Sequence, residues 1–298
     1  MNYTRILKRA WHITFHNKAL WLFGFLFSLF SSGGGSSTGQ GMRYTFDGGD
    51  RVLLLPGWAI LLLLLSIGLL LLVLGVVLRY SSRGALIGMV READQTGQTS
   101  ASSGWRIGWS RFLPLFGIEW AIAIPAVVVM LLLLAIGLSP LVLLAAENRA
   151  LTIVAIAATV LMMLLVIGLL TAMGLVLSIV GELAHRQCVL ENKGVLESIR
   201  DGYRTGRQNL QHVGLIWVLL LVLSLAFGAV MVPIAAVVFG LAAAPAAAIY
   251  GATESIWSSL LLGVLLAIPG MLAFAFLNGI FEAFKSAVWT LAYEEMQL

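Results

Sequence analysis

The chain has 298 residues, of which 60% are hydrophobic and 11% are charged, and its mean hydropathy is +0.99. A soluble core could not bury this much apolar surface, so the composition excludes a soluble globular protein and predicts an integral membrane protein. The net charge of +4 would suggest a nucleic-acid partner only in a soluble protein. In a membrane protein, the positions of the basic residues indicate first how the chain is oriented in the membrane, so we expect no nucleic-acid partner.

Six apolar stretches are candidate membrane spans, because about twenty apolar residues cross the hydrocarbon core of a bilayer. They cover residues 19–32, 52–79, 112–138, 151–181, 212–240 and 256–284. The first is short and should continue a helix that starts near Tyr3. The fourth and sixth are long and should run past the membrane into the polar segments that follow. No convincing cleavage site follows the basic amino terminus, so we expect this segment to be retained.

The connections on one side of the spans differ in composition. Residues 31–51 are rich in glycine and serine and predict a flexible loop. Residues 139–150 are short and should turn at Pro140, whereas residues 241–255 are mostly alanine around Pro245 and apolar enough to lie at the interface. The scarcity of aromatic and charged residues here weighs against an outer receptor.

The distribution of basic residues predicts the topology. Fifteen of the 18 Lys and Arg residues fall in the amino-terminal segment, between spans two and three, between spans four and five, and after span six. Only Arg43, Arg51 and Arg149 fall on the other side. Since cytoplasmic loops carry the excess of positive charge, we expect both termini to be cytoplasmic in a multi-pass protein of the cell membrane.

Two motifs recur three times along the chain. Residues 10–14, 104–108 and 202–206, which we name the pentads, read Ala-Trp-His-Ile-Thr, Gly-Trp-Arg-Ile-Gly and Gly-Tyr-Arg-Thr-Gly. Residues 85–92, 184–191 and 287–294, which we name the Ala–Glu segments, each begin with Ala and end with Glu. Each copy follows the last by roughly a hundred residues, so the sequence predicts a single membrane domain, residues 1–298, built from three internal repeats. The repeats cover approximately residues 1–98, 99–194 and 195–298.

The predicted fold is all-α: six transmembrane helices in three two-helix repeats. Because each repeat holds two spans, all three enter the membrane in the same direction, and we expect a pseudo-threefold about an axis along the membrane normal. Residues 4–18, 102–111 and 195–209 mix apolar and basic residues at helical spacing. They predict an interfacial amphipathic helix on the cytoplasmic side before each repeat's first span. The glycines at both ends of the second and third pentads have a spacing that allows close helix packing.

Three carboxylates lie in or near the apolar stretches, namely Glu119, Glu182 and Glu282. An acid at membrane depth is costly and is a functional candidate by default. Glu182 and Glu282 are close to the cytoplasmic edge, where we favour snorkelling or a pair with an arginine of a neighbouring repeat. Glu119 lies deeper, and for it a structural ion pair and a role in transport remain equally open.

The pentads supply the candidate binding residues. These are Trp11, His12, Trp105, Arg106, Tyr203 and Arg204. Basic side chains on the cytoplasmic side attract anionic headgroups, and aromatic side chains are common anchors at the interface. Generic anchoring is the favoured interpretation, and specific capture of lipid phosphate is the alternative.

Metal binding and catalysis have little support. His12 and His16 share a helix face, but no nearby acid or cysteine completes a metal site, and Cys188 is the single cysteine. The sequence contains no phosphate-binding glycine loop, nucleophile elbow or metalloprotease motif. We therefore expect a protein that is not an enzyme and needs no cofactor.

The Ala-Trp-His and Gly-Trp-Arg sequences before apolar helices, with Ser-Ala-Val-Trp-Thr-Leu-Ala-Tyr-Glu-Glu at residues 286–295, carry a resemblance. The chain resembles the membrane domain found on some bacterial glycerophosphodiester phosphodiesterases. This resemblance implies a protein of the bacterial inner membrane, without the hydrolase activity, because the catalytic domain is absent.

Besides a membrane enzyme, which has little support, the sequence leaves two functions open. The first is a noncatalytic membrane component whose basic cytoplasmic face binds lipid headgroups or a membrane-protein partner. The second is a transporter of a small solute or lipid, with a path between the repeats past Glu119.

Overall fold

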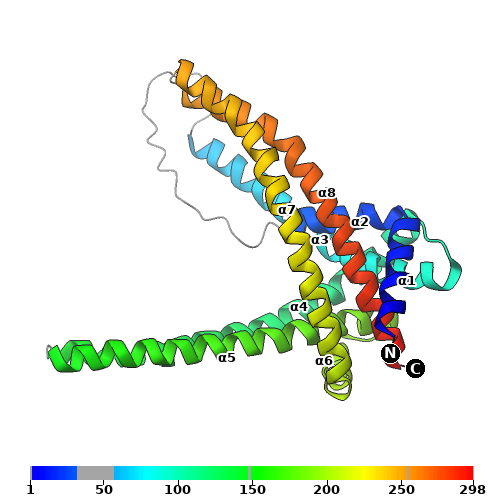
Figure 1. Cartoon of the computed structure of the whole chain (residues 1–298), viewed down its shortest axis with the longest axis horizontal. Helices are drawn as coiled ribbons and strands as arrows, with labels where there is room; N and C mark the ends of the chain where they lie inside the picture. Colours follow the sequence, from blue (N-terminus) through cyan, green and yellow to red (C-terminus); the bar gives the residue numbers. More distant parts are fainter. Residues whose placement is uncertain (1, 32–56, 147–148, 254, 298) are drawn as a thin grey trace. The chain divides into compact units, whose positions relative to one another are not determined.

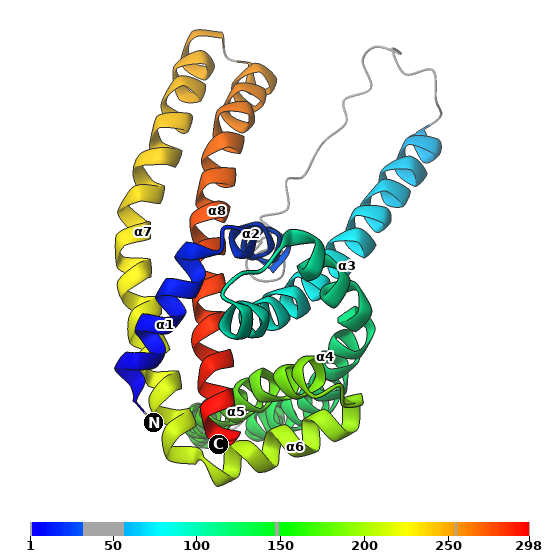
Figure 2. The same ribbon diagram turned by 90° about the vertical axis from the view of Figure 1, so that its right-hand side faces the viewer.

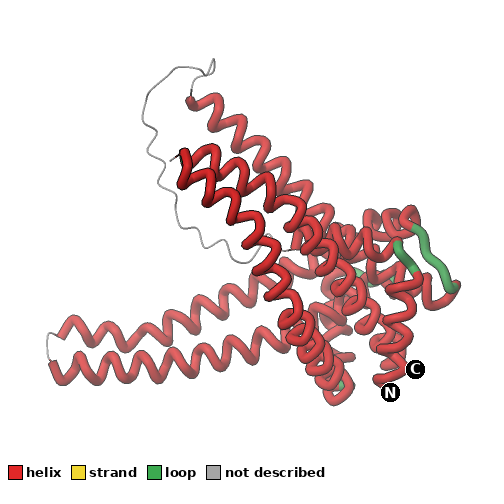
Figure 3. Tube along the Cα trace, turned by 45° about the horizontal axis from the view of Figure 1, so that its top comes forward, coloured by secondary structure: helices red, strands yellow, loops and turns green. Residues whose placement is uncertain are grey.

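The structure is a computed structural model that describes residues 2–31, 57–146, 149–253 and 255–297. Within these ranges the regular elements are all helical, with no strand (Figure 3). The α-helices, labelled in Figure 1, are α1 (Tyr3–His16), α2 (Ala19–Ser31), α3 (Gly57–Thr96), α4 (Ala101–Leu138), α5 (Arg149–Leu190), α6 (Val195–Gln208), α7 (Leu210–Thr253) and α8 (Ile256–Gln297). A 3₁₀ helix, η2 (Ser139–Ala146), follows α4.

The helices confirm the membrane class that the composition predicts. Five of those described are long and apolar enough to cross a membrane, and the pair α1 and α2, bent by 95°, makes a sixth if it counts as one span. Their apolar side chains are largely exposed along most of their length. Because lipid covers such a surface and water does not, these helices indicate a multi-pass membrane protein.

Some helices extend beyond the apolar stretches. Helices α5 and α8 continue to Leu190 and Gln297, as predicted, and α3 continues to Thr96, which hydropathy did not predict. Residues 241–255, expected to connect two spans at the interface, are helical for most of their length, because α7 continues through Pro245 to Thr253; their place at the interface stays a prediction. Alanine has the highest helix propensity, and this run of alanines carries the helix past the proline. The expected turn at Pro140 lies in the 3₁₀ helix η2.

Most of the expected glycine-rich loop, with Arg43 and Arg51, lies outside the described residues. Of the three predicted amphipathic segments, two are separate helices, α1 and α6. The third, residues 102–111, forms the first turns of α4 and is not a separate helix. An asparagine follows each of the two separate helices. After α1, the side-chain amide of Asn17 donates a hydrogen bond to the Ile13 carbonyl oxygen. After α6, the backbone of Asn209 leaves helical geometry, with φ −117° and ψ 33°. Residues 109–112, Trp-Ser-Arg-Phe, contain no such residue, so the helix continues.

The chain forms two compact units. Unit 1 contains Met1–Ile6, Leu113–Leu223 and Trp289–Leu298, and unit 2 contains Leu7–Phe112 and Ser224–Val288. In unit 1, α6 and η2 pack on α5. In unit 2, α2 packs on α3, and α7 and α8 run side by side as a hairpin (Figure 2).

The best-buried part of unit 1 lies at the end of α5. Ile118, Ala184 and Cys188 form a buried apolar cluster, against which Val195 and Ile199 of α6 pack. In unit 2, the end of α3 is buried from Ala85 to Val90. Both stretches fall in Ala–Glu segments, so these motifs form cores within their own units.

Candidate functional site

The glycines of the second and third pentads pack against helices that carry Ala–Glu segments. In unit 2, a Cβ atom added to Gly108 would overlap the Ser81 carbonyl oxygen of α3, and one added to Gly104 would overlap the Met89 sulfur. In unit 1, a Cβ atom added to Gly202 would lie 2.9 Å from the Ala184 backbone nitrogen of α5. Gly108 and Gly202 therefore allow two backbones to approach closely, as the spacing predicted, whereas Gly104 makes room for the Met89 side chain.

The first pentad has larger residues at the same positions, Ala10 and Thr14, and both are fully buried. Their neighbours point outward: Trp11 is 58% exposed and packs on Phe15 at 4.2 Å between ring centroids. The exposed His12 ring stacks on His16 at 5.2 Å. Among the described residues, no cluster of His, Cys, Asp and Glu could hold a metal ion.

The second and third pentads have the same two faces. Trp105 is 44% exposed and stacks on Trp109 at 5.9 Å, and Arg106 beside it is exposed. Tyr203 is 52% exposed, and Arg204 follows it with its side chain also exposed. All six candidate binding residues therefore have exposed side chains. Those of the first two pentads belong to unit 2 and those of the third to unit 1.

The third pentad borders a surface hollow of about 770 Å³. The lining residues all come from α6 and are Glu197, Arg200, Asp201, Tyr203, Arg204, Arg207 and Gln208. Three guanidinium groups and two carboxylates thus share one face of a helix. Planar guanidinium groups bind phosphate oxygens through paired hydrogen bonds, so this surface can hold an anion.

The three candidate carboxylates lie in different surroundings. Glu182 forms an ion pair with Arg186, one turn later on α5, with 2.6 Å between Oε2 and Nη1. Glu282 pairs with Lys285 on α8, also at 2.6 Å. Both of these pairs are made within one helix. Glu119 is half-buried on α4, and its Oε2 atom is enclosed by protein.

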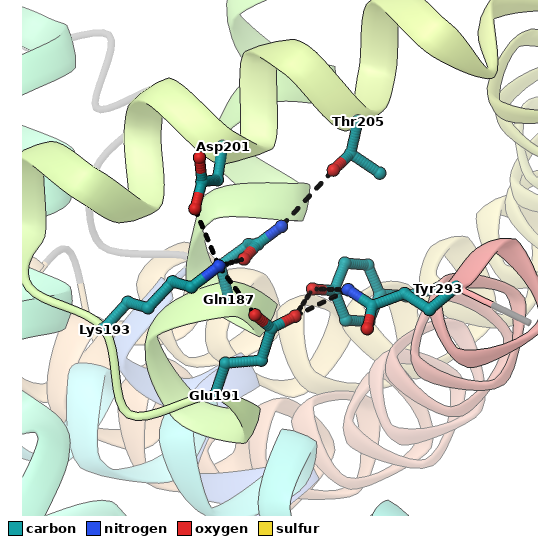
Figure 4. A network of polar contacts seen from close by, with 7 residues as sticks. Gln187, Glu191, Lys193, Asp201, Thr205 and Tyr293 are labelled. Atoms are coloured by element: carbon teal, nitrogen blue, oxygen red, sulfur yellow. Dashed lines mark hydrogen bonds and ion pairs between the residues drawn. The ribbon is translucent and has the colours of Figure 1, made fainter.

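A polar network at the end of α5 was not anticipated from the sequence. Figure 4 shows the Lys193 ammonium between two carboxylates, 2.7 Å from Glu191 Oε2 and 2.7 Å from Asp201 Oδ2. Lys193 also donates to the side-chain oxygen of Gln187 at 3.0 Å. The Glu191 carboxylate accepts a hydrogen bond from the Tyr293 hydroxyl of α8. These contacts tie α5, α6 and the end of α8 together within unit 1.

The network shifts the acidity of its members. Burial raises the pKa of Glu191, but the hydrogen bonds from Lys193, Tyr293 and Gln297 together outweigh it, so the pKa lies below its usual value. The hydrogen bond to Asp201, followed by the one to Glu191, raises the pKa of Lys193. The network therefore stabilises the charged forms of both groups, as a structural tie does.

The repeat is the signal in the sequence that could have pointed to this network. Glu191 closes the second Ala–Glu segment, and the first closes at Glu92, which accepts a 2.8 Å hydrogen bond from Thr99 Oγ1. In both copies the glutamate ties the end of one helix to the segment that leads into the next. In the sequence, Lys193 is one of the basic residues that predict the topology, and in the structure it is the centre of the network.

No solved structure and no curated protein matches the chain. A family model does match, over residues 15–291, and it describes a family of unknown function, DUF7544. The match contains no link to the membrane domain of glycerophosphodiester phosphodiesterases, so that resemblance stays a prediction. Because the match covers nearly the whole sequence, the chain belongs to the DUF7544 family.

Proposed function

We propose that the protein is a noncatalytic component of a bacterial inner membrane that binds lipid headgroups through the pentads. The observation that carries the proposal is the division of each pentad into two faces. Small residues are buried, in the second and third pentads against a neighbouring helix, and an aromatic and a basic side chain are exposed beside them. Indole and phenol rings favour the headgroup layer, and each cation near an anionic surface contributes about 1 kcal/mol.

The finer architecture belongs to the same proposal. Three parallel two-helix repeats would place the three pentads at the same membrane depth, with both termini in the cytoplasm. Helices α1 and α6 would then lie in the headgroup layer, with the first turns of α4 in the equivalent position. Fusing a reporter to either end of the chain tests this topology, and a reporter outside the cell would contradict it.

Phospholipid retained after purification in mild detergent, measured by native mass spectrometry, tests the binding proposal. We expect the wild-type protein to retain phospholipid and the double variant Arg106→Ala, Arg204→Ala to retain less. The charge-matched control is Arg43→Ala, Arg149→Ala, which removes two cations from the side that the topology places outside. The proposal is overturned if the wild type retains no phospholipid, if both double variants retain equal amounts, or if a bound protein takes the place of lipid.

A further inference from the structure

Helix α6 differs from the equivalent segments of the other two repeats in its basic residues. Subtracting the 98-residue spacing of the pentads pairs Arg200, Arg204 and Arg207 with Ser102, Arg106 and Trp109. In the first repeat, residues 8, 12 and 15 are Lys, His and Phe. Only the third repeat has three guanidinium groups at these positions, and Arg207 stands where the others have an aromatic residue. This pattern indicates a role for α6 beyond anchoring by aromatic residues.

The surroundings of the hollow on α6 leave its guanidinium groups available. Its opposite face is buried against α5 through Ser198, Gly202 and Gly206. Among the described residues, Arg200, Arg204 and Arg207 form no ion pair. The Asp201 carboxylate is already paired with Lys193 at 2.7 Å, so its charge is largely compensated.

The charges of the hollow and the apolar residues beside it define the ligand. Against three guanidinium groups, only Glu197 remains as an uncompensated carboxylate in the lining, so the hollow has a net positive charge. Two large side chains, Leu196 and Tyr203, lie seven residues apart and are 78% and 52% exposed. Residues seven apart lie on one side of a helix, so this apolar edge runs beside the guanidinium groups. A ligand that contacts both the guanidinium groups and this apolar edge must carry an anionic phosphate group and an apolar portion.

We propose that the hollow on α6 is a selective site for one anionic phospholipid headgroup, of the phosphatidylglycerol class. This inference rests on the proposed function and deepens it, because it assigns selectivity to one repeat. The guanidinium groups of Arg200 and Arg207 donate to the phosphate oxygens, and Leu196 packs against the acyl chains. Glu197 lowers the affinity for headgroups with more than one negative charge by like-charge repulsion.

Competition between lipids tests the site. The full-length protein is incorporated in nanodiscs of equal parts phosphatidylglycerol and phosphatidylcholine, and the lipids that remain bound are counted by native mass spectrometry. We expect the double variant Arg200→Ala, Arg207→Ala to lose the preference for phosphatidylglycerol by about 25-fold, since each cation near the surface contributes about a factor of five. Both side chains are exposed, so the thermal midpoint should be unchanged.

Two further variants separate the possible failures. Leu196→Ser should also weaken retention, because a lipid uses the apolar edge; an unchanged result would assign the hollow to a soluble phosphate and overturn the lipid site. If Arg106→Ala, Arg204→Ala lowers total phospholipid but Arg200→Ala, Arg207→Ala keeps the wild-type preference, this inference fails and the proposed function stands. If the wild type retains no phospholipid at all, the proposed function fails as well.

Discussion

The contact between α6 and α5 predicts the effect of Gly202→Ala. The added Cβ atom would lie 2.9 Å from the Ala184 nitrogen, 3.2 Å from its Cα and 3.3 Å from the Val180 carbonyl oxygen. These are backbone atoms, so the helices must separate, and overpacking of this kind costs about 1–3 kcal/mol. The higher helix propensity of alanine offsets about 1 kcal/mol of that cost. We expect a net loss of up to about 2 kcal/mol, which lowers the thermal midpoint by up to about 4 °C.

Cys188 provides the assay. It is the single cysteine of the chain and is fully buried in the cluster beside this contact, so a maleimide dye reacts with it only after unfolding. Two glycines serve as controls: a Cβ atom on Gly206 would meet only the end of the Leu183 side chain at 3.2 Å, and one on Gly214 would meet nothing within 4 Å. Alanine at either position should leave the midpoint unchanged or raise it. If Gly202→Ala raises the midpoint as Gly214→Ala does, then α6 does not lie this close to α5.

The ion pairs of unit 1 also contribute to stability. Lys193→Met removes the cation shared by Glu191 and Asp201, and because the ammonium is partly exposed we expect a loss of about 1 kcal/mol. The pKa of Glu191 is lowered from its usual value of 4.5 in the folded protein. The contribution of the Glu191 carboxylate to stability is therefore present above pH 4.5 and is lost as the pH falls through the folded pKa. Acid should lower the thermal midpoint less in Lys193→Met than in the wild type. Glu182→Ala removes an ion-pair partner of Arg186, whose side chain is 2% exposed, and should cost about 2 kcal/mol. The maleimide assay measures both.

A second ion pair within one helix is the control for Glu182→Ala. Lys285, the partner of Glu282, has a side chain that is 28% exposed, so its ammonium can turn to water when the carboxylate is removed. Glu282→Ala should therefore cost less than Glu182→Ala. Equal losses of stability in the two variants would show that burial of the cation does not determine how much stability is lost. An unchanged acid response in Lys193→Met would show that Lys193 is not what lowers the pKa of Glu191.

The apolar helices could be predicted from the sequence because hydropathy is a local property of the chain. The extension of α3 to Thr96 could not, because residues 85–90 are helical in a buried core that exists only after folding. The continuous start of α4 was missed for a different reason. All three amphipathic segments have similar composition, but an asparagine follows α1 and α6 and has no equivalent in the second repeat.

The candidate site was predictable in part. The pentads indicated exposed aromatic and basic side chains next to packed glycines, because both properties follow from helical spacing within five residues. The network around Lys193 depends on Tyr293, which is 102 residues from Glu191 in the sequence, and no local pattern joins the two. The repeat singled out Glu191 without showing its partners.

The two faces of the pentads separate binding from stability. Between helices in lipid there is little hydrophobic driving force, so close contact of small residues and hydrogen-bonded networks must hold the helices together. Gly104 faces the Met89 sulfur, whereas Arg106, two residues later, is exposed. Gly104→Ala should therefore lower the thermal midpoint of unit 2 and leave the phospholipid retained per folded molecule little changed. Arg106→Ala should lower the retained phospholipid and leave the thermal midpoint little changed. Circular dichroism melting with lipid counting measures both, and a single variant that lowers both equally would mean that the two faces are not independent.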